Sequence, residues 1–169
     1  SDTLIEFIGR QKMFFVGTAT AASRVNISPK GMDSLRVLSA NRVVWLNLTG
    51  SGNETAAHVQ SSPRMTLMFC AFEGPPLILR LYGTAQAVHR NDAGWPALAD
   101  LFPPTPGARQ IFDLSIDLVQ ASCGMAVPNY DYVSDRNELS EWTRELGDEG
   151  IRAYWEKKNQ TSIDGIVTH

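Results

Sequence analysis

The sequence predicts a mainly β fold, an antiparallel barrel with peripheral helices, from the spacing and periodicity of its apolar segments. Seven short segments are typical of strands, and most of them are bounded by Gly, Pro, Asn or Ser. They span residues 13–20, 25–28, 34–38, 42–48, 64–72, 77–90 and 110–122. Within the last two, apolar and polar residues alternate, which predicts one face toward a core and one toward solvent.

The chain opens with a predicted helix. Thr3 is followed three residues later by Glu6, as in a capping box. An apolar stripe follows from Leu4, Ile5 and Ile8. We expect this helix to pack across one mouth of the barrel.

Alternation is clearest in the last strand segment, where Phe112, Leu114, Ile116 and Leu118 alternate with Asp113, Ser115 and Asp117. In segment 77–90, one face carries Leu77, Leu79 and Leu81 and the other carries Arg80, Tyr82, Thr84 and Gln86. The polar face of this segment is therefore free to meet solvent, a ligand or another subunit.

Helical regions interrupt or follow the strands at 53–61, near 95–102, and as a pair at 136–146 and 148–158. The first helix of the pair has a stripe of Leu139, Trp142 and Leu146, and the second has one of Ile151, Tyr154 and Trp155. Such stripes are usually core, so we expect both to be buried. Because residues 102–107 form a stiff Pro-rich loop rather than a linker, we predict one domain over residues 1–169, with a C-terminal helical segment at about 136–158.

Composition and charge indicate a folded, soluble protein and argue against several partners. Hydrophobic residues make up 43% of the 169 residues and charged residues 20%, with a net charge of −3. Lys and Arg form no stripe, so we expect no nucleic-acid partner. The longest apolar stretch, 65–72, is too short to span a membrane, and no signal-peptide pattern is present, so we expect no membrane association and a cytoplasmic location.

The cysteines and histidines predict no metal centre. Cys70 and Cys123 form no CxxC or zinc pair and are expected to be free thiols. His58 and His89 stand alone in the sequence, and His169 is expected to belong to a frayed tail. We therefore expect neither a metal nor a haem.

A glycine-rich turn at 46–59 is the most informative stretch, because it joins a strand to a helix. Gly50 and Gly52 let the backbone approach a phosphate, and the free N–H groups of the helix start point to the same place. Side-chain donors come from Thr49, Ser51, Asn53 and Thr55. The alternative is an ordinary bend with Asn53 as N-cap and Glu54 in the first turn.

A second stretch, 26–33, carries Lys30 beside Pro29 and Gly31. Lys30 is either a group that faces a phosphate or the edge of a flavin ring, or a solvated turn lysine.

Taken in their order along the chain, the two stretches and the segments that follow them resemble the sequence pattern of the pyridoxamine 5′-phosphate oxidase-related family over about residues 13–90. The family pattern has an extended segment with Pro, a strand ending in Thr, a Gly-Ser turn into a helix, a Pro-Arg strand start, and a strand with Gly before small and polar residues. The matching pieces are Ser28-Pro29-Lys30-Gly31, Leu48-Thr49, Gly50-Ser51-Gly52, Pro63-Arg64-Met65 and Gly83-Thr84-Ala85.

The resemblance implies a split β-barrel of FMN-binding type that forms a homodimer, with FMN in a groove between subunits. By position, the flavin ring would be lined by Ser28, Pro29, Lys30 and Gly31. The ribityl chain and phosphate would meet Leu48, Thr49, Ser51, Gly52, Asn53 and Thr55. Arg80 would complete the phosphate site from the same or the other chain. A dimer also suits the polar face around Arg80 and Gln86 and the aromatic residues of the last helices, which one small barrel cannot cover.

The chain departs from the family at two places. Family members commonly place Arg or Lys at the turn into the helix, whereas this chain has Asn53-Glu54-Thr55. Either Glu54 turns outward while Lys30 or Arg80 supplies the charge, or the chain holds another cofactor such as a deazaflavin. The tail at 162–166 lacks the Arg- and His-bearing segment of the true oxidase, so the vitamin B6 reaction is not expected.

Three functions follow from these patterns. The first is a flavin-dependent oxidoreductase, possible substrates being small molecules, in which the flavin does the chemistry and no side-chain acid or base is evident. The second is a non-catalytic flavin-binding protein that stores, carries or senses the cofactor. The third is an interaction module with an empty groove.

Overall fold

The structure, a computed structural model that describes residues 1–168, contains one antiparallel sheet. Its seven strands are β1 (Phe14–Thr18), β2 (Asn26–Lys30), β3 (Leu35–Ser39), β4 (Arg42–Leu48), β5 (Arg64–Cys70), β6 (Ile78–His89) and β7 (Ala108–Ser122). The helices are α1 (Asp2–Arg10), α2 (Glu54–Ser61), α3 (Trp95–Ala99) and α4 (Glu138–Lys158). The mainly β prediction is confirmed, and the strand ends differ from the predicted ones by at most two residues.

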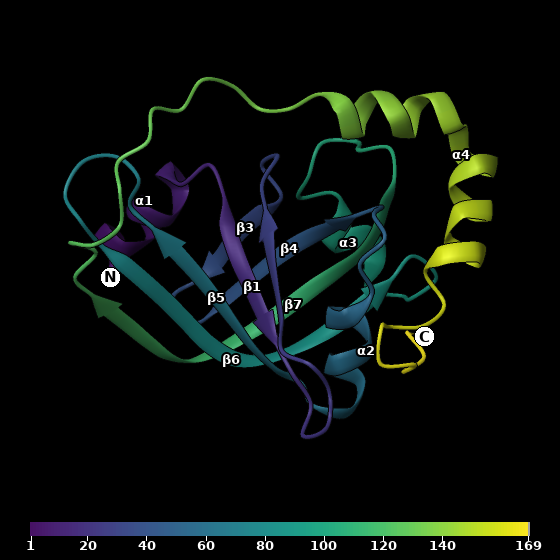
Figure 1. Cartoon of the computed structure of the whole chain (residues 1–169), viewed down its shortest axis with the longest axis horizontal. Helices are drawn as coiled ribbons and strands as arrows, with labels where there is room; N and C mark the ends of the chain where they lie inside the picture. The colour runs from purple at the N-terminus through teal and green to yellow at the C-terminus, as the bar shows by residue number, and fades with distance from the viewer. Residues whose placement is uncertain (169) are drawn as a thin grey trace.

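The sheet is a barrel that stays split along one line. Strands run in the order β2-β1-β5-β6-β7-β4-β3, so β2 and β3 are the two edges. These edges follow one another in sequence and are joined only by residues 31–34, so the sheet must curl to bring them together. No backbone ladder joins β2 to β3 in the part of the chain described, and the barrel therefore remains open between them (Figure 1).

Aromatic residues fill the barrel interior. Trp45 of β4 stacks on Phe112 of β7 with ring centroids 4.5 Å apart, and Phe14 packs against Trp45 and Phe69. These side chains alternate with outward residues because a strand has a side-chain period of two. The predicted alternation of segment 110–122 accordingly places Phe112 and Leu114 in the core.

Helices α1 and α2 lie at opposite ends of the barrel (Figure 1). Phe7 and Ile8 of α1 and Ala56 and Val59 of α2 belong to the same buried core, as expected for the opening helix. The predicted capping box is wrong, however. The helix begins at Asp2 after Ser1, which makes no side-chain capping bond, so Thr3 lies inside the helix.

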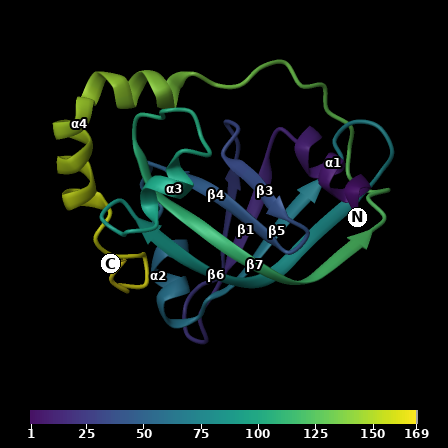
Figure 2. The ribbon, with the colours of Figure 1, turned by 180° about the vertical axis from the view of Figure 1, so that it is seen from behind.

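Helix α3 covers the outer face of the sheet beside β4 and β7 (Figure 2). Val44, Leu46 and Ile111 point to this side and are buried against Phe102 and partly buried residues of α3. Because β4 is covered on both faces, it is almost continuously apolar rather than alternating.

Helix α4 lies at the periphery and is reached by a long segment without helix or strand (Figure 1). Gly147, with φ of 62°, divides it near the predicted break, because this left-handed backbone conformation suits glycine. Of the two predicted stripes, only Ile151 is fully buried, and the other five residues are partly buried. Trp142 and Tyr154 meet each other across the bend, with ring centroids 5.1 Å apart.

Candidate functional site

Near the split, side chains of β2 form hydrogen bonds to α2 and to β4. Asn26 Nδ2 donates to Thr55 Oγ1 at 3.2 Å, and Lys30 Nζ donates to Asn47 Oδ1 at 3.3 Å. Asn26 Nδ2 also donates to Ser28 Oγ at 3.2 Å. We call these five residues, Asn26, Ser28, Lys30, Asn47 and Thr55, the polar seam. Three of them, Ser28, Lys30 and Thr55, are predicted site residues.

Lys30 is a partly buried cation in this seam. Burial lowers its pKa to about 8, the charge of Arg109 lowers it further, and Glu54 opposes the shift. The ammonium lies 5.1 Å from the centroid of the Trp45 ring, which partly offsets the lost hydration through a cation–π contact. The interpretation of Lys30 as a solvated turn residue is therefore wrong.

Arg109 is a second and more deeply buried cation that was absent from the sequence prediction. It lies where a bulge separates the pairs Asn47–Gln110 and Leu48–Ala108, and such bulges redirect side chains. The side chain is 8% exposed, and burial lowers its pKa to about 10 against the opposing effects of Tyr154 and Glu54. A usable signal was the Arg109-Gln110 pair near the start of a strand that follows Gly107.

The guanidinium of Arg109 holds the glycine-rich loop. Nη2 donates to the Gly52 carbonyl at 2.8 Å, and Nη1 donates to Asn53 Oδ1 at 3.3 Å and to the Gly50 carbonyl at 3.4 Å. All of these acceptors are uncharged. Among residues 1–168, neither Arg109 nor Lys30 forms an ion pair with a carboxylate.

Glu54 occupies the N-terminus of α2. Its carboxylate accepts the Asn53 backbone N–H at 3.0 Å and the Ile163 backbone N–H at 3.2 Å. Helix N-termini favour negative charge, and here the chain supplies that charge itself. Asn53 is the N-cap residue of α2 and Glu54 lies in its first turn, as the alternative interpretation expected, although the Asn53 side chain makes no capping bond.

The C-terminal strap, residues 159–168, covers this loop. Asn159 Nδ2 donates to the Gly50 carbonyl at 2.8 Å and to Asn53 Oδ1 at 2.7 Å. In return, Asn53 Nδ2 donates to the carbonyls of Lys158 at 2.8 Å and Thr161 at 3.1 Å. Both the nitrogen and the oxygen of the Asn53 side-chain amide therefore already form hydrogen bonds within the chain.

The strap is anchored at both ends. Just before it, Trp155 Nε1 donates to Thr49 Oγ1 at 2.8 Å, while Thr49 Oγ1 donates to the Gly107 carbonyl at 2.6 Å. Further along, Asp164 pairs with Arg24, which precedes β2. The strap thus reaches from the α2 loop to the start of β2.

The remaining predicted residues are dispersed. Ser51 and Gly52 are exposed in the loop, and Leu48 is partly covered at the end of β4. Pro29 is exposed between the seam residues Ser28 and Lys30, and Gly31 begins the turn that follows them.

Arg80 lies elsewhere, in a groove of about 580 Å³ formed mainly by β1, β5 and β6. It shares the groove with Arg64, Tyr82 and Asp117, and its Nη1 donates to Ser122 Oγ at 3.2 Å. No bond joins it to the glycine-rich loop of its own chain in the described residues.

Metal-ligating side chains do not gather into a group of three anywhere in residues 1–168. His58 is buried, with Nδ1 3.0 Å from Thr18 Oγ1, and His169 lies outside the described residues. Both described cysteines are free thiols, as expected. Over residues 1–168, no helix combines the length and hydropathy needed to cross a membrane.

Solved structures share this fold at low sequence identity. Group A Streptococcus HupZ aligns with a TM-score of 0.58 and 18% identity, covering 72% of this chain and 98% of that one. A pyridoxamine 5′-phosphate oxidase-related, FMN-binding protein from Nostoc punctiforme aligns with a TM-score of 0.56 and 12% identity, covering 75% and 85%. The fold is therefore that of the split β-barrels.

Sequence comparisons define the family. The family model described as pyridoxamine 5′-phosphate oxidase matches residues 1–123. The pyridoxamine 5′-phosphate oxidase family protein ustO of Aspergillus flavus is 34% identical over 186 residues, covering 98% of this chain and 74% of that protein. This chain belongs to the pyridoxamine 5′-phosphate oxidase family. The family match ends at residue 123, before α4 and the strap, whereas the alignment with ustO extends over 98% of the chain.

Proposed function

We propose that this protein binds FMN and acts as a flavin-dependent oxidoreductase on a small molecule other than a B6 vitamer. The observation that carries the proposal is a pair of cations, the partly buried Lys30 and the buried Arg109, which has no carboxylate ion pair in the described chain. A buried charge is costly unless a counter-charge accompanies it. A bound anion beside the predicted flavin segment would supply that counter-charge.

The residues of the split fit a flavin better than the helix start fits a phosphate. Ser28, Lys30 and Gly31 would face the ring, and Thr55 and Arg109 would face the ribityl phosphate. Glu54 already fills the N-terminus of α2, so the phosphate is assigned to the Lys30 and Arg109 side of the loop. When bound, the flavin supplies hydride transfer, and the chain orients it and excludes water.

We also propose that a second copy of the chain covers the groove around Arg80. Val25, Ile27 and Leu118 on this side are 72%, 67% and 58% exposed, which is a large apolar surface for a monomer. Covering it would allow Arg80 to approach the flavin of the partner. A specific interface would bury about 1,600 Å², and monomeric mass in light scattering with flavin bound would rule out this arrangement.

Cofactor release tests the central proposal. The purified protein is expected to be yellow, and heat or acid should release FMN at close to one per chain. A colourless protein that takes up no FMN at micromolar concentration would overturn the assignment, as would a deazaflavin spectrum or a haem band. Glu54 favours the deazaflavin among these, because it weakens the phosphate site at the helix.

Catalysis is tested separately from binding. Anaerobic addition of NADH or NADPH should bleach the bound flavin if the protein is an oxidoreductase. A flavin that stays oxidised with both donors would support the alternative, a protein that stores, carries or senses the cofactor.

A further inference from the structure

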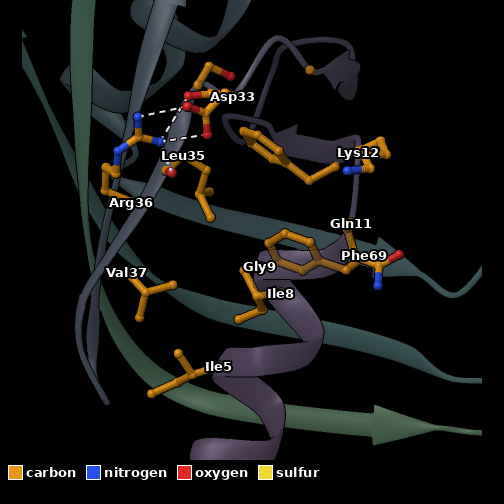
Figure 3. Close-up of a pocket in the computed structure, with 13 residues that line it drawn as sticks. Ile5, Ile8, Gly9, Gln11, Lys12, Asp33, Leu35, Arg36, Val37 and Phe69 are labelled. Carbon is orange, nitrogen blue, oxygen red and sulfur yellow. Dashed lines mark hydrogen bonds and ion pairs between the residues drawn. The ribbon is translucent and has the colours of Figure 1, made fainter. Parts of the chain in front are cut away.

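A second cavity, of about 250 Å³, lies between α1 and β3 at the mouth of the barrel (Figure 3). Ile5 and Ile8 of α1 form one wall, Leu35 and Val37 of β3 form the opposite wall, and Phe69 lies between them. These apolar walls come from separate elements. The cavity opens to solvent at the barrel mouth, where Ile5, Lys12 and Asp33 are exposed.

The walls of the cavity are suited to an apolar ligand. Ile5 is 37% exposed, and Leu35 and Val37 are only partly buried although they pack against the main core. Helix α1 therefore leaves apolar surface uncovered that a compact hydrocarbon body would bury. At 250 Å³ the cavity lies below the range of about 300–1,000 Å³ that holds drug-sized molecules, so the body must be small.

One side of the cavity mouth is the strained turn from β2 to β3. Met32 and Asp33, in the turn from β2 to β3, have φ of 59° and 53°, a left-handed conformation that is costly for residues other than glycine. Arg36 holds the turn by donating from Nη1 and Nη2 to the Asp33 carboxylate at 2.8 and 2.9 Å. Its guanidinium also lies 4.7 Å from the Phe102 ring centroid. The turn is therefore held in place despite its strain.

The charges at the mouth favour an anion. Asp33 and Arg36 neutralise each other, and Lys12 is the remaining charged residue of the cavity lining. Lys12 forms no ion pair with a carboxylate in residues 1–168, and its ammonium is 5.2 Å from the Tyr132 ring centroid. The mouth thus carries one net positive charge.

We propose that this cavity binds the body of the substrate, a single ring or short branched chain that bears one negative charge. Gly31 lines the cavity and also ends the segment assigned to the flavin ring, so a molecule seated here would lie beside that segment. The assignment as a substrate site rests on the proposed flavin function. The binding of a small apolar anion does not.

The test uses flavin-free protein. Benzoate is the anionic probe and benzamide its neutral counterpart, and the binding of each is measured by ligand-observed NMR titration. Val37→Phe fills the cavity and should weaken benzoate at least about tenfold, because an overpacked site excludes the ring. Leu38→Phe is the matched control, since Leu38 is the next residue on β3 and does not line the cavity. It should leave benzoate binding unchanged.

The charge is tested at Lys12. Lys12→Gln should weaken benzoate about threefold, the size expected for an exposed ion pair, and leave benzamide unchanged. Lys157→Gln, on the exposed side of α4, should affect neither probe.

Each outcome separates the two proposals. No saturable benzoate binding, or equal binding by wild type and folded Val37→Phe, would overturn the cavity site even if the protein holds FMN. The expected pattern in a protein that takes up no FMN would keep the cavity as an anion site and remove its role beside a flavin.

Discussion

The lowered pKa of Lys30 predicts that FMN affinity falls as pH rises. The free lysine titrates at about 8, and a phosphate that restored its ordinary pKa of 10.5 would bind through the protonated form. Linkage between these two values makes FMN binding about tenfold weaker at pH 9 than at pH 7. The phosphate of FMN itself titrates near pH 6, below this window.

The assay is a fluorescence titration of FMN and riboflavin at pH 7, 8 and 9. Lys30→Met removes the charge while keeping a long apolar side chain, so its FMN affinity should be nearly independent of pH. Lys157→Met, on the exposed surface of α4, is the control for a lost positive charge. Equal pH dependence for FMN in wild type and Lys30→Met would refute the reasoning. An equal fall for riboflavin would place Lys30 at the ring instead of the phosphate.

The same shift has a consequence for the flavin-free protein. Because the folded pKa of Lys30 is lowered, the unfolded chain binds the proton more tightly between pH 8 and pH 10.5. The free energy of unfolding should therefore rise with pH across this window, by up to about 3 kcal/mol from this group. Urea denaturation of wild type and Lys30→Met measures the difference, and identical slopes against pH would contradict the burial of this charge.

Three further substitutions test other parts of the structure. Gly52→Val should still fold, because the added Cβ would lie 3.5 Å from Glu54 Oε2, an ordinary contact. It should lower FMN affinity several-fold and riboflavin affinity less, because riboflavin has no phosphate for the side chain to exclude. Equal losses for both flavins would remove the loop from the phosphate site. Gly83→Ala should cost about 3 kcal/mol or more in urea denaturation, because its Cβ would lie 1.9 Å from the Ser115 carbonyl oxygen, and near-wild-type stability would show that the bulge opens easily. Trp155→Phe deletes the bond to Thr49 and should cost about 1 kcal/mol and speed proteolysis within the strap, whereas an unchanged digestion pattern would mean that the strap is held by its other contacts.

Local sequence patterns were sufficient for most of the fold. Every strand was predicted because alternation and turn residues act within a few positions of one another. The helix pair around Gly147 was predicted for the same reason. Of its stripes, only Ile151 is fully buried as predicted, since whether an apolar face meets a core depends on where the helix docks.

In the candidate site, too, local motifs could be predicted from the sequence and tertiary contacts could not. Lys30 could be singled out from the chain because it lies in a motif with Pro29 and Gly31, but its burial could not be predicted. Arg109 was missed because a one-residue bulge, formed only when β4 pairs with β7, directs it toward the glycine-rich loop.

The sequence by itself determined the strands, the two motifs proposed to bind the cofactor and the family resemblance, since each depends on residues that are close together along the chain. Only the tertiary structure decided that Glu54 fills the start of α2 and that the C-terminal strap covers the loop. The bond from Trp155 to Thr49 joins residues 106 positions apart. Contacts at such separation depend on the path of the whole chain, because closing so long a loop is repaid only when the intervening barrel has formed.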